Sequence, residues 1–223
     1  DGNWSLKING LLQTRWTSID NDATPVAATN GGSQWAFANN RTWVNLSGTI
    51  AGDFSYDIRH NLTPAAIAVA AGPPVTATNG NNGDWANGSM NLNDDWSITA
   101  GSMKMASSRE TMIDDQYQLT MDRQLINVGG LPAAGFRVGQ GVQLGYAGDD
   151  LRFMGQLFNN FAQVASATND SSSALNLRAE FMVEGSGWGQ FDEFTSADGG
   201  AAGTLIGLSW LTLDDGDTGA AGA

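Results

Sequence analysis

Charged side chains in this 223-residue chain recur at alternate positions of segments that otherwise switch between polar and apolar residues. The charged positions are Lys7, Arg15, Asp57, Arg59, Arg137, Arg178 and Glu180. Charges of both signs along one wetted surface set the local electric field and the dehydration cost that passing ions meet. The residues therefore favour the handling of ions and polar solutes over the making or breaking of bonds.

The residues that catalysis and metal binding require are scarce. The chain has no Cys, a single His (His60) and no phosphate-binding Gly-Lys motif, and no nucleophile, base and acid stand together. The Gly-Asn-Asn-Gly stretch at 80–83 raises the alternative of a calcium-binding site, but it lacks the regular ligand spacing of a calcium-binding loop. We expect no enzymatic activity, no cofactor and no metal.

The net charge of −13 argues against nucleic acid as a partner, because nucleic-acid binding requires a basic surface. Many of the acids stand in turn-like contexts, such as Asp94-Asp95 and Asp149-Asp150, where Asp is a common turn former. The alternative is that acidic loops attract cations to the mouth of a passage.

Residues 4–16 alternate in polarity with a period of two, which predicts a β-strand. One face carries Trp4, Leu6, Ile8, Leu12 and Trp16, and the other carries Lys7, Asn9, Gln13 and Arg15. At ~3.3 Å per residue and a tilt of ~40°, the two Trp residues lie about 30 Å apart in height, which matches the apolar layer of a bilayer. The pattern indicates lipid on one face and water on the other.

The same alternation recurs over 44–59, 136–158, 175–183 and 204–213, with a weaker strand at 84–93. Membrane barrels and β-sandwiches both alternate in this way. Charges in mid-strand and aromatic residues at the row ends favour a transmembrane antiparallel β-barrel whose polar rows line the lumen; the sandwich remains the alternative. The expected membrane girdle consists of Trp4, Trp16, Phe54, Tyr56, Phe136 and Tyr146. We expect the same-face neighbours Asp57 with Arg59, and Arg178 with Glu180, to form ion pairs.

Connection lengths give an independent check. Short turns are expected at 51–53, 93–95 and 147–150, and long loops at 17–40, within 62–85, at 106–133 and at 163–173. Outer-membrane barrels alternate short periplasmic turns with long external loops, so this order places the start of the first strand on the periplasmic side. The long 185–203 connection breaks the scheme, because a short turn is expected there.

Five segments carry a family resemblance. They include Leu-Lys-Ile-Asn-Gly-Leu-Leu-Gln within 4–15, Val-Asn-Leu-Ser-Gly-Thr-Ile within 44–59, Ser-Ile-Thr-Ala-Gly-Ser-Met-Lys-Met within 96–110, Met-Asp-Arg-Gln-Leu-Ile-Asn at 121–127, and Gly-Val-Gln-Leu-Gly-Tyr-Ala-Gly-Asp-Asp-Leu within 137–158. In this order they resemble the phosphate-selective porin O and P family of Gram-negative outer membranes. The resemblance implies an all-β barrel of sixteen strands, usually a homotrimer in outer-membrane lipid, whose third external loop folds inward and narrows the pore.

By the strand count, that constriction loop is 106–133. The charged residues at and on it are Lys104, Arg109, Glu110, Asp114, Asp115, Asp122 and Arg123. Anion-selective relatives line the path with many Arg and Lys, whereas this chain has only ten in all. We therefore expect a general diffusion pore for small hydrophilic solutes and ions, neutral or mildly cation-preferring. A secreted or surface-anchored β-sandwich that acts in binding or adhesion is the alternative function. About half of the expected strands are found, so residues 1–223 are expected to form the N-terminal half of the barrel.

Overall fold

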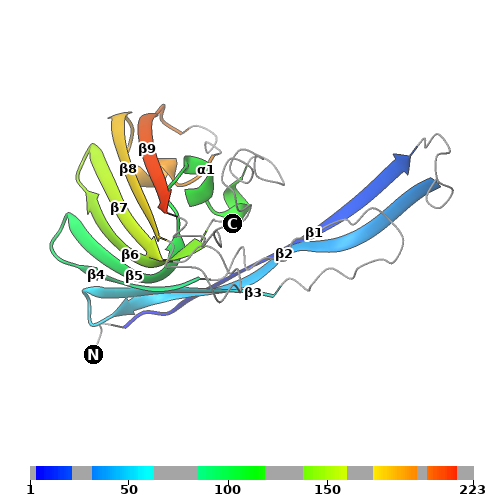
Figure 1. Ribbon diagram of the computed structural model, residues 1–223, viewed down its shortest axis with the longest axis horizontal. Helices are drawn as coiled ribbons and strands as arrows, with labels where there is room; N and C mark the ends of the chain where they lie inside the picture. Colours follow the sequence, from blue (N-terminus) through cyan, green and yellow to red (C-terminus); the bar gives the residue numbers. More distant parts are fainter. Residues whose placement is uncertain are drawn as a thin grey trace, which may run out of the picture.

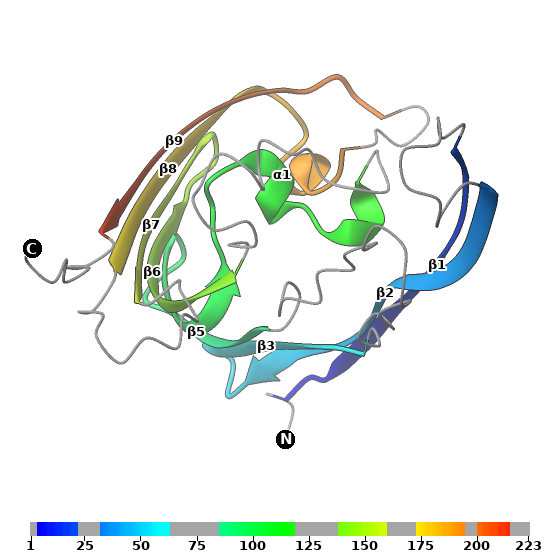
Figure 2. The same ribbon diagram turned by 45° about the vertical axis from the view of Figure 1, so that its right-hand side comes forward.

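The computed structural model describes residues 4–21, 32–62, 85–118, 138–159, 173–194 and 200–214. Nine strands lie in these ranges and form one antiparallel sheet in chain order. They are β1 (Lys7–Asn21), β2 (Gly32–Ile50), β3 (Phe54–Asn61), β4 (Trp85–Asn91), β5 (Trp96–Lys104), β6 (Val138–Ala147), β7 (Leu151–Asn159), β8 (Ser173–Glu184) and β9 (Thr204–Asp214). The sheet curves into a trough, and α1 (Arg109–Met112) lies inside the curve (Figures 1 and 2).

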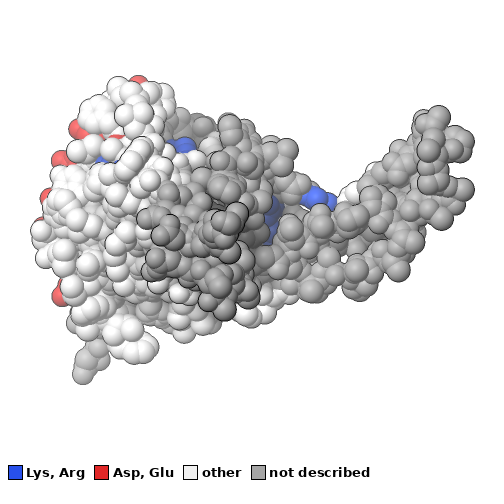
Figure 3. Space-filling view, viewed as in Figure 1, with Lys and Arg blue, Asp and Glu red and all other residues white. Residues whose placement is uncertain are grey.

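The expected short turns are confirmed at one end of the sheet. They join β2 to β3, β4 to β5 and β6 to β7, at 51–53, 92–95 and 148–150. In the first of them Ala51 and Gly52 have φ angles of 53° and 83°, the left-handed conformation that lets a tight hairpin follow the twist of its strands. Acidic groups gather along this end of the molecule (left edge of Figure 3), where Asp94 and Asp149 are exposed.

The prediction of a long loop at 17–40 is wrong, because β1 continues to Asn21 and β2 begins at Gly32. The two strands form a hairpin that extends beyond the rest of the sheet (Figure 1). The register shifts between Gln13 and Thr14, which marks an irregularity in the pairing. Beyond it Trp16 pairs with Phe37, and the outward row continues.

The two faces of the sheet have opposite polarity. Large apolar side chains on the outward face are exposed: Leu12 is 68% exposed, Leu157 53% and Leu208 74%. The concave face instead buries polar side chains, namely Asn45, Arg59, Thr99, Gln156, Asn176, Arg178 and Glu180. A β-sandwich requires the apolar face to be covered by a second sheet. All strands of the described ranges belong to one sheet, so the arrangement contradicts the sandwich interpretation.

Two non-strand segments lie against the concave face. The first inner segment, residues 105–118, contains α1 and the 3-10 turn η1 (Asp115–Tyr117). The second inner segment, residues 185–194, contains the 3-10 turn η2 (Trp188–Phe191). Both lie within the curve of the sheet in Figure 2. In the described ranges, none of the helices is long and apolar enough to cross a membrane.

A small apolar cluster packs at the junction between the end of β5 and the first inner segment. Met103, Met105 and Phe158 are buried together, with Leu211 of β9 packed against them. A side chain at Gly139 would bring its Cβ within 2.7 Å of the Phe158 ring, so a residue without a Cβ is needed there. The cluster lets the chain turn onto the concave face while the sheet continues into β6 and β7.

Candidate functional site

The first inner segment leaves the sheet at the end of β5, where side chains of β7 and β9 form hydrogen bonds with its backbone. The Gln156 side chain accepts a hydrogen bond from Ala106 N at 2.8 Å and donates one to Lys104 O at 2.9 Å. The Ser209 hydroxyl donates to Ser107 O at 2.5 Å. These bonds satisfy backbone groups that would otherwise lose their partners where the chain leaves the ladder. The segment is therefore held to the wall of the trough at its first residues.

Asp114 anchors the far part of this segment to the sheet. Its carboxylate forms ion pairs with Lys104 and with Arg59, and Arg59 Nη2 lies 3.1 Å from Asp114 Oδ2. The Arg59 guanidinium, in a residue only 4% exposed, is stacked between the rings of Trp43 and Trp85 at 3.8 and 3.9 Å from their centroids. Stacking of a cation on two aromatic faces fixes the guanidinium plane. The two Trp rings therefore hold the Arg59 guanidinium in position to pair with Asp114.

The surroundings of Asp114 also set its protonation. Burial of the carboxyl favours the neutral form, but the charges of Lys104 and Arg59 and their hydrogen bonds outweigh this effect, so the pKa of Asp114 lies below its ordinary value. The anchor is therefore ionised at neutral pH.

Arg109 joins the two inner segments. Its Nη2 donates to Phe191 O at 2.7 Å and to Glu193 O at 3.1 Å. Its guanidinium carbon lies 5.6 and 5.7 Å from the ring centroids of Phe191 and Phe194. Phe194 N donates to Tyr117 O at 3.4 Å. Burial lowers the pKa of Arg109, whereas nearby Glu180 raises it, and an arginine keeps its charge at any physiological pH.

The second inner segment is also tied to the short turn between β6 and β7. Trp188 Nε1 donates to Gly148 O at 2.7 Å, and the guanidinium of Arg152 lies 4.7 Å from the centroid of the Trp188 ring. Phe191 is buried at 7% exposure. Residues 185–194 of this long connection are therefore folded against the concave face, where the loop alternation predicts a short turn.

Glu180 is the centre of a buried charge cluster on the wall beneath both segments. Arg178 donates to Glu180 Oε1 from Nε at 3.0 Å and from Nη2 at 2.6 Å, and Arg152 Nε pairs with Oε2. The Glu180 side chain is 0% exposed. Next to the cluster, Asn176 Nδ2 donates to Gln156 Oε1 at 2.8 Å. Such a group is stable in the interior only because both carboxylate oxygens are paired.

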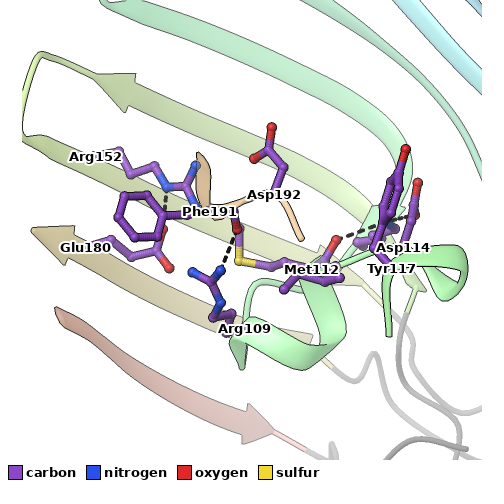
Figure 4. Close-up of a pocket in the computed structure, with 10 residues that line it drawn as sticks. Arg109, Met112, Asp114, Tyr117, Arg152, Glu180, Phe191 and Asp192 are labelled. Carbon is purple, nitrogen blue, oxygen red and sulfur yellow. Dashed lines mark hydrogen bonds and ion pairs between the residues drawn. The ribbon is translucent and has the colours of Figure 1, made fainter. Parts of the chain in front are cut away.

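A cavity of about 320 Å³ lies between the two inner segments and the wall. In Figure 4, Arg152 and Glu180 lie at one end and Asp114 and Tyr117 at the other, with Met112 between them. The lining is completed by Lys104, Arg109, Ile113, Phe191 and Asp192. Three cations and three carboxylates therefore face a small space that also has apolar walls. The arrangement suits the contact of polar solutes and ions with fixed charges.

The family model for phosphate-selective porin O and P matches residues 13–196. The chain belongs to this family of porins. A search of the curated proteins finds no match. The one-layered antiparallel sheet is that of a partial β-barrel porin. The family is one of outer-membrane channels and is not enzymatic.

The predicted lumen-lining residues of the porin lie on the polar side of the sheet wherever the structure describes them. Arg59, Arg178 and Glu180 are buried there, Asp57 and Arg15 are half-buried and Lys7 is exposed, whereas Arg137 lies outside the described residues. The predicted pair of Arg178 with Glu180 is present. The predicted pair of Asp57 with Arg59 is wrong: Asp57 accepts a hydrogen bond from Trp85 Nε1 at 2.9 Å, and Arg59 turns to Asp114. Their contact with permeating ions stays a prediction.

The residues expected at the constriction are partly brought together. Lys104 is the last residue of β5 and contacts Asp114, and Arg109 joins the second inner segment. Glu110 is half-buried, and Asp115 lies 3.8 Å from Arg41 of β2. Asp122 and Arg123, like all of 119–133 and the 80–83 stretch, lie outside the described residues. That 106–133 narrows the pore stays a prediction.

Five of the six expected girdle residues are described by the structure, and these lie on the outward face. Trp4, Trp16 and Phe54 are 73%, 61% and 50% exposed. Tyr56 and Tyr146 are half-buried, and Tyr146 packs on Trp96 with ring centroids 5.0 Å apart. Phe136 lies outside the described residues. Their position at the membrane interface stays a prediction.

Several residues of the site were missed by the sequence analysis. Arg152 follows a turn and precedes Gln156 on the same face of β7, so strand alternation could have found it. Trp43 and Trp85 occupy polar faces, where an aromatic residue indicates a partner inside the barrel. Phe191 and Asp192 carry no such signal, because they lie in a connection without regular alternation.

The depressed pKa of Asp114 predicts the pH range over which its segment stays anchored in this porin. A carboxyl with a folded pKa below the unfolded value of about 3.9 contributes its full stabilisation above that value and loses it as the pH falls through the folded pKa. We expect the single-channel conductance of the wild type to be constant from pH 7 to about pH 5 and to change only below about pH 4. Asp114→Asn is expected to show at pH 7 what the wild type shows only in acid.

The matched control is Asp149→Asn, which removes an exposed carboxylate from a short turn. It is expected to keep the wild-type profile. A conductance that changes between pH 7 and 5 in the wild type, or an Asp114→Asn variant that behaves as the wild type at neutral pH, contradicts the anchor.

Proposed function

We propose that the protein is a general diffusion porin of the Gram-negative outer membrane, through which small hydrophilic solutes and ions pass passively. The observation that carries the proposal is the inversion of polarity across the sheet: exposed Leu, Ile, Phe and Trp outside, and buried Arg, Glu, Asn and Gln inside. A soluble protein of this size buries its apolar face, whereas a membrane barrel exposes it to lipid. Following the family expectation, we extend the proposal to a homotrimer surrounded by outer-membrane lipid.

The balance of charge inside supports weak discrimination between anions and cations. Asp114 is paired with Lys104 and Arg59, and Glu180 with Arg152 and Arg178. Paired charges produce a smaller field than a row of one sign. We therefore propose that selectivity for phosphate does not extend to this chain, and that the inner segments act as the narrowing of the pore.

Single-channel recording in planar bilayers tests this proposal. The wild type is expected to give ohmic conductance steps in KCl, with a reversal potential near zero under a salt gradient. Arg109→Gln removes the charged donor that joins the two inner segments. Because each hydrogen bond from a charged group contributes ~1.5–3 kcal/mol, the joined state should lose at least about tenfold in population, and the conductance should rise.

Glu184→Gln, at the exposed end of β8, is the control and is expected to leave the conductance unchanged. The absence of steps from the wild type contradicts the proposed function. Equal conductance of Arg109→Gln and the wild type contradicts the narrowing role of the joined segments.

A further inference from the structure

The cavity between the inner segments has the size and the mixed lining of a small-molecule site. Its volume of about 320 Å³ lies at the lower end of the ~300–1,000 Å³ range of such pockets. It lies between the first inner segment, which follows β5, and the second, which follows β8. Its lining combines the charged groups described above with Met112, Ile113 and Phe191.

Unused hydrogen-bond donors face the cavity from two guanidinium groups. Arg109 uses Nη2 for its two carbonyl partners, and Arg152 uses Nε for Glu180. Among the described residues, their other guanidinium nitrogens have no hydrogen-bond partner. Two guanidinium groups that line one space and keep donors available are suited to a planar carboxylate, which accepts several such bonds.

An unused acceptor faces the same cavity. Asp192, from the second inner segment, is exposed, and its carboxylate has no ion pair or hydrogen bond within the part of the chain that the structure describes. The other two carboxylates of the lining, Asp114 and Glu180, are each bonded to two basic side chains. Asp192 is therefore the carboxylate best able to accept hydrogen bonds from an ammonium group.

We propose that this cavity is a binding site on the permeation path for small zwitterionic amino acids. The inference rests on the proposed channel function and names a solute class for it. Arg109 and Arg152 bind the carboxylate, Asp192 binds the ammonium group, and the side chain lies against Met112 and Phe191. Three carboxylates in the lining disfavour a multiply charged anion, because each repels it at short range. A zwitterion meets both signs of charge without a net penalty.

The test measures single-channel current in KCl at pH 7 while serine is added. A bound zwitterion carries no current, so the conductance should fall saturably with serine. N-acetylserine has only the carboxylate and serinamide only the ammonium group; both are expected to block at concentrations about tenfold higher, which is equivalent to ~1.4 kcal/mol for one lost charge-assisted contact. Inorganic phosphate is expected to block more weakly than serine.

Asp192→Asn should weaken the block by serine about tenfold and leave that by N-acetylserine unchanged. Asp150→Asn, which alters an exposed turn carboxylate, is the matched control, and serine should block this variant as it blocks the wild type. Equal or stronger block by N-acetylserine or phosphate overturns the proposal in favour of a simple anion site, and conductance steps without a saturable effect of serine overturn it outright. These results differ from a failure of the channel function, which gives no steps at all. The wild-type comparison decides the question even if Asp192→Asn does not insert.

Discussion

Glu180→Gln is expected to lower the free energy of unfolding by about 3–5 kcal/mol, the typical cost of removing one partner of a buried ion pair. Glu180 accepts from Arg178 at 2.6 Å and from Arg152, and its side chain is fully buried. The amide has almost the same shape but no charge, so two guanidinium groups remain in the interior without a counter-charge. Urea unfolding of the porin in lipid vesicles, followed by Trp fluorescence, measures the change.

Glu184→Gln is the control for this measurement, because it makes the same chemical change on the same strand at an exposed position, beyond the register shift that follows Met182. It is expected to stay within about 0.5 kcal/mol of the wild type, as surface substitutions do. A loss for Glu180→Gln no larger than that of Glu184→Gln would mean that the cluster does not stabilise the wall.

Leu208→Lys is expected to cost about 2–4 kcal/mol of folding free energy in a bilayer, the cost of a basic residue at the midplane of a barrel's lipid face. Leu208 lies in the middle of β9, points outward and is 74% exposed. If water covered this face, the same substitution would be within about 0.5 kcal/mol of neutral, as is usual for exposed positions. The folding free-energy cost of Leu208→Lys therefore differs clearly between a lipid-covered and a water-covered face.

Thr204→Lys supplies the control, because Thr204 is on the same outward face but at the start of the strand. Near the interface the penalty falls to about 0–1 kcal/mol. Equal costs at 204 and 208 would remove the depth dependence that lipid imposes and would contradict the membrane-facing assignment.

The strand pattern predicted the wall well, because it depends on local alternation that each strand carries in its own residues. Residues 175–181 alternate between apolar and polar side chains and lie within β8, and the weak Asn- and Gly-containing stretch at 84–93 contains a strand as expected. The 17–40 loop was overestimated because the register shift inserts an extra residue, position 40, into β2 between the partners of Gln13 and Thr14. The alternation of β2 is therefore interrupted there, although that of β1 continues.

The interior of the barrel was less predictable, because its contacts join residues far apart in the sequence. Arg109 binds carbonyls 82 and 84 positions away, and Asp114 pairs with Arg59 at a separation of 55. No local period links such residues. The error at Asp57 and Arg59 has the same origin: neighbours on one face were expected to pair, but Trp43 and Trp85 hold the Arg59 guanidinium on the side of Asp114.

The most direct test of the account asks which solvent touches each face of residues 5–13, the start of β1 with the two residues before it. The chain has no Cys, so single Cys residues at 5–13 can carry a nitroxide label, one at a time, in the porin embedded in a bilayer. Positions 6, 8 and 12 should collide chiefly with dissolved oxygen, which concentrates in lipid, and positions 7, 9 and 13 with a water-soluble nickel chelate. A period of two with these phases is the expected result. Nickel accessibility at Leu6, Ile8 and Leu12 equal to that at Lys7, Asn9 and Gln13 would contradict the claim that the apolar face meets lipid.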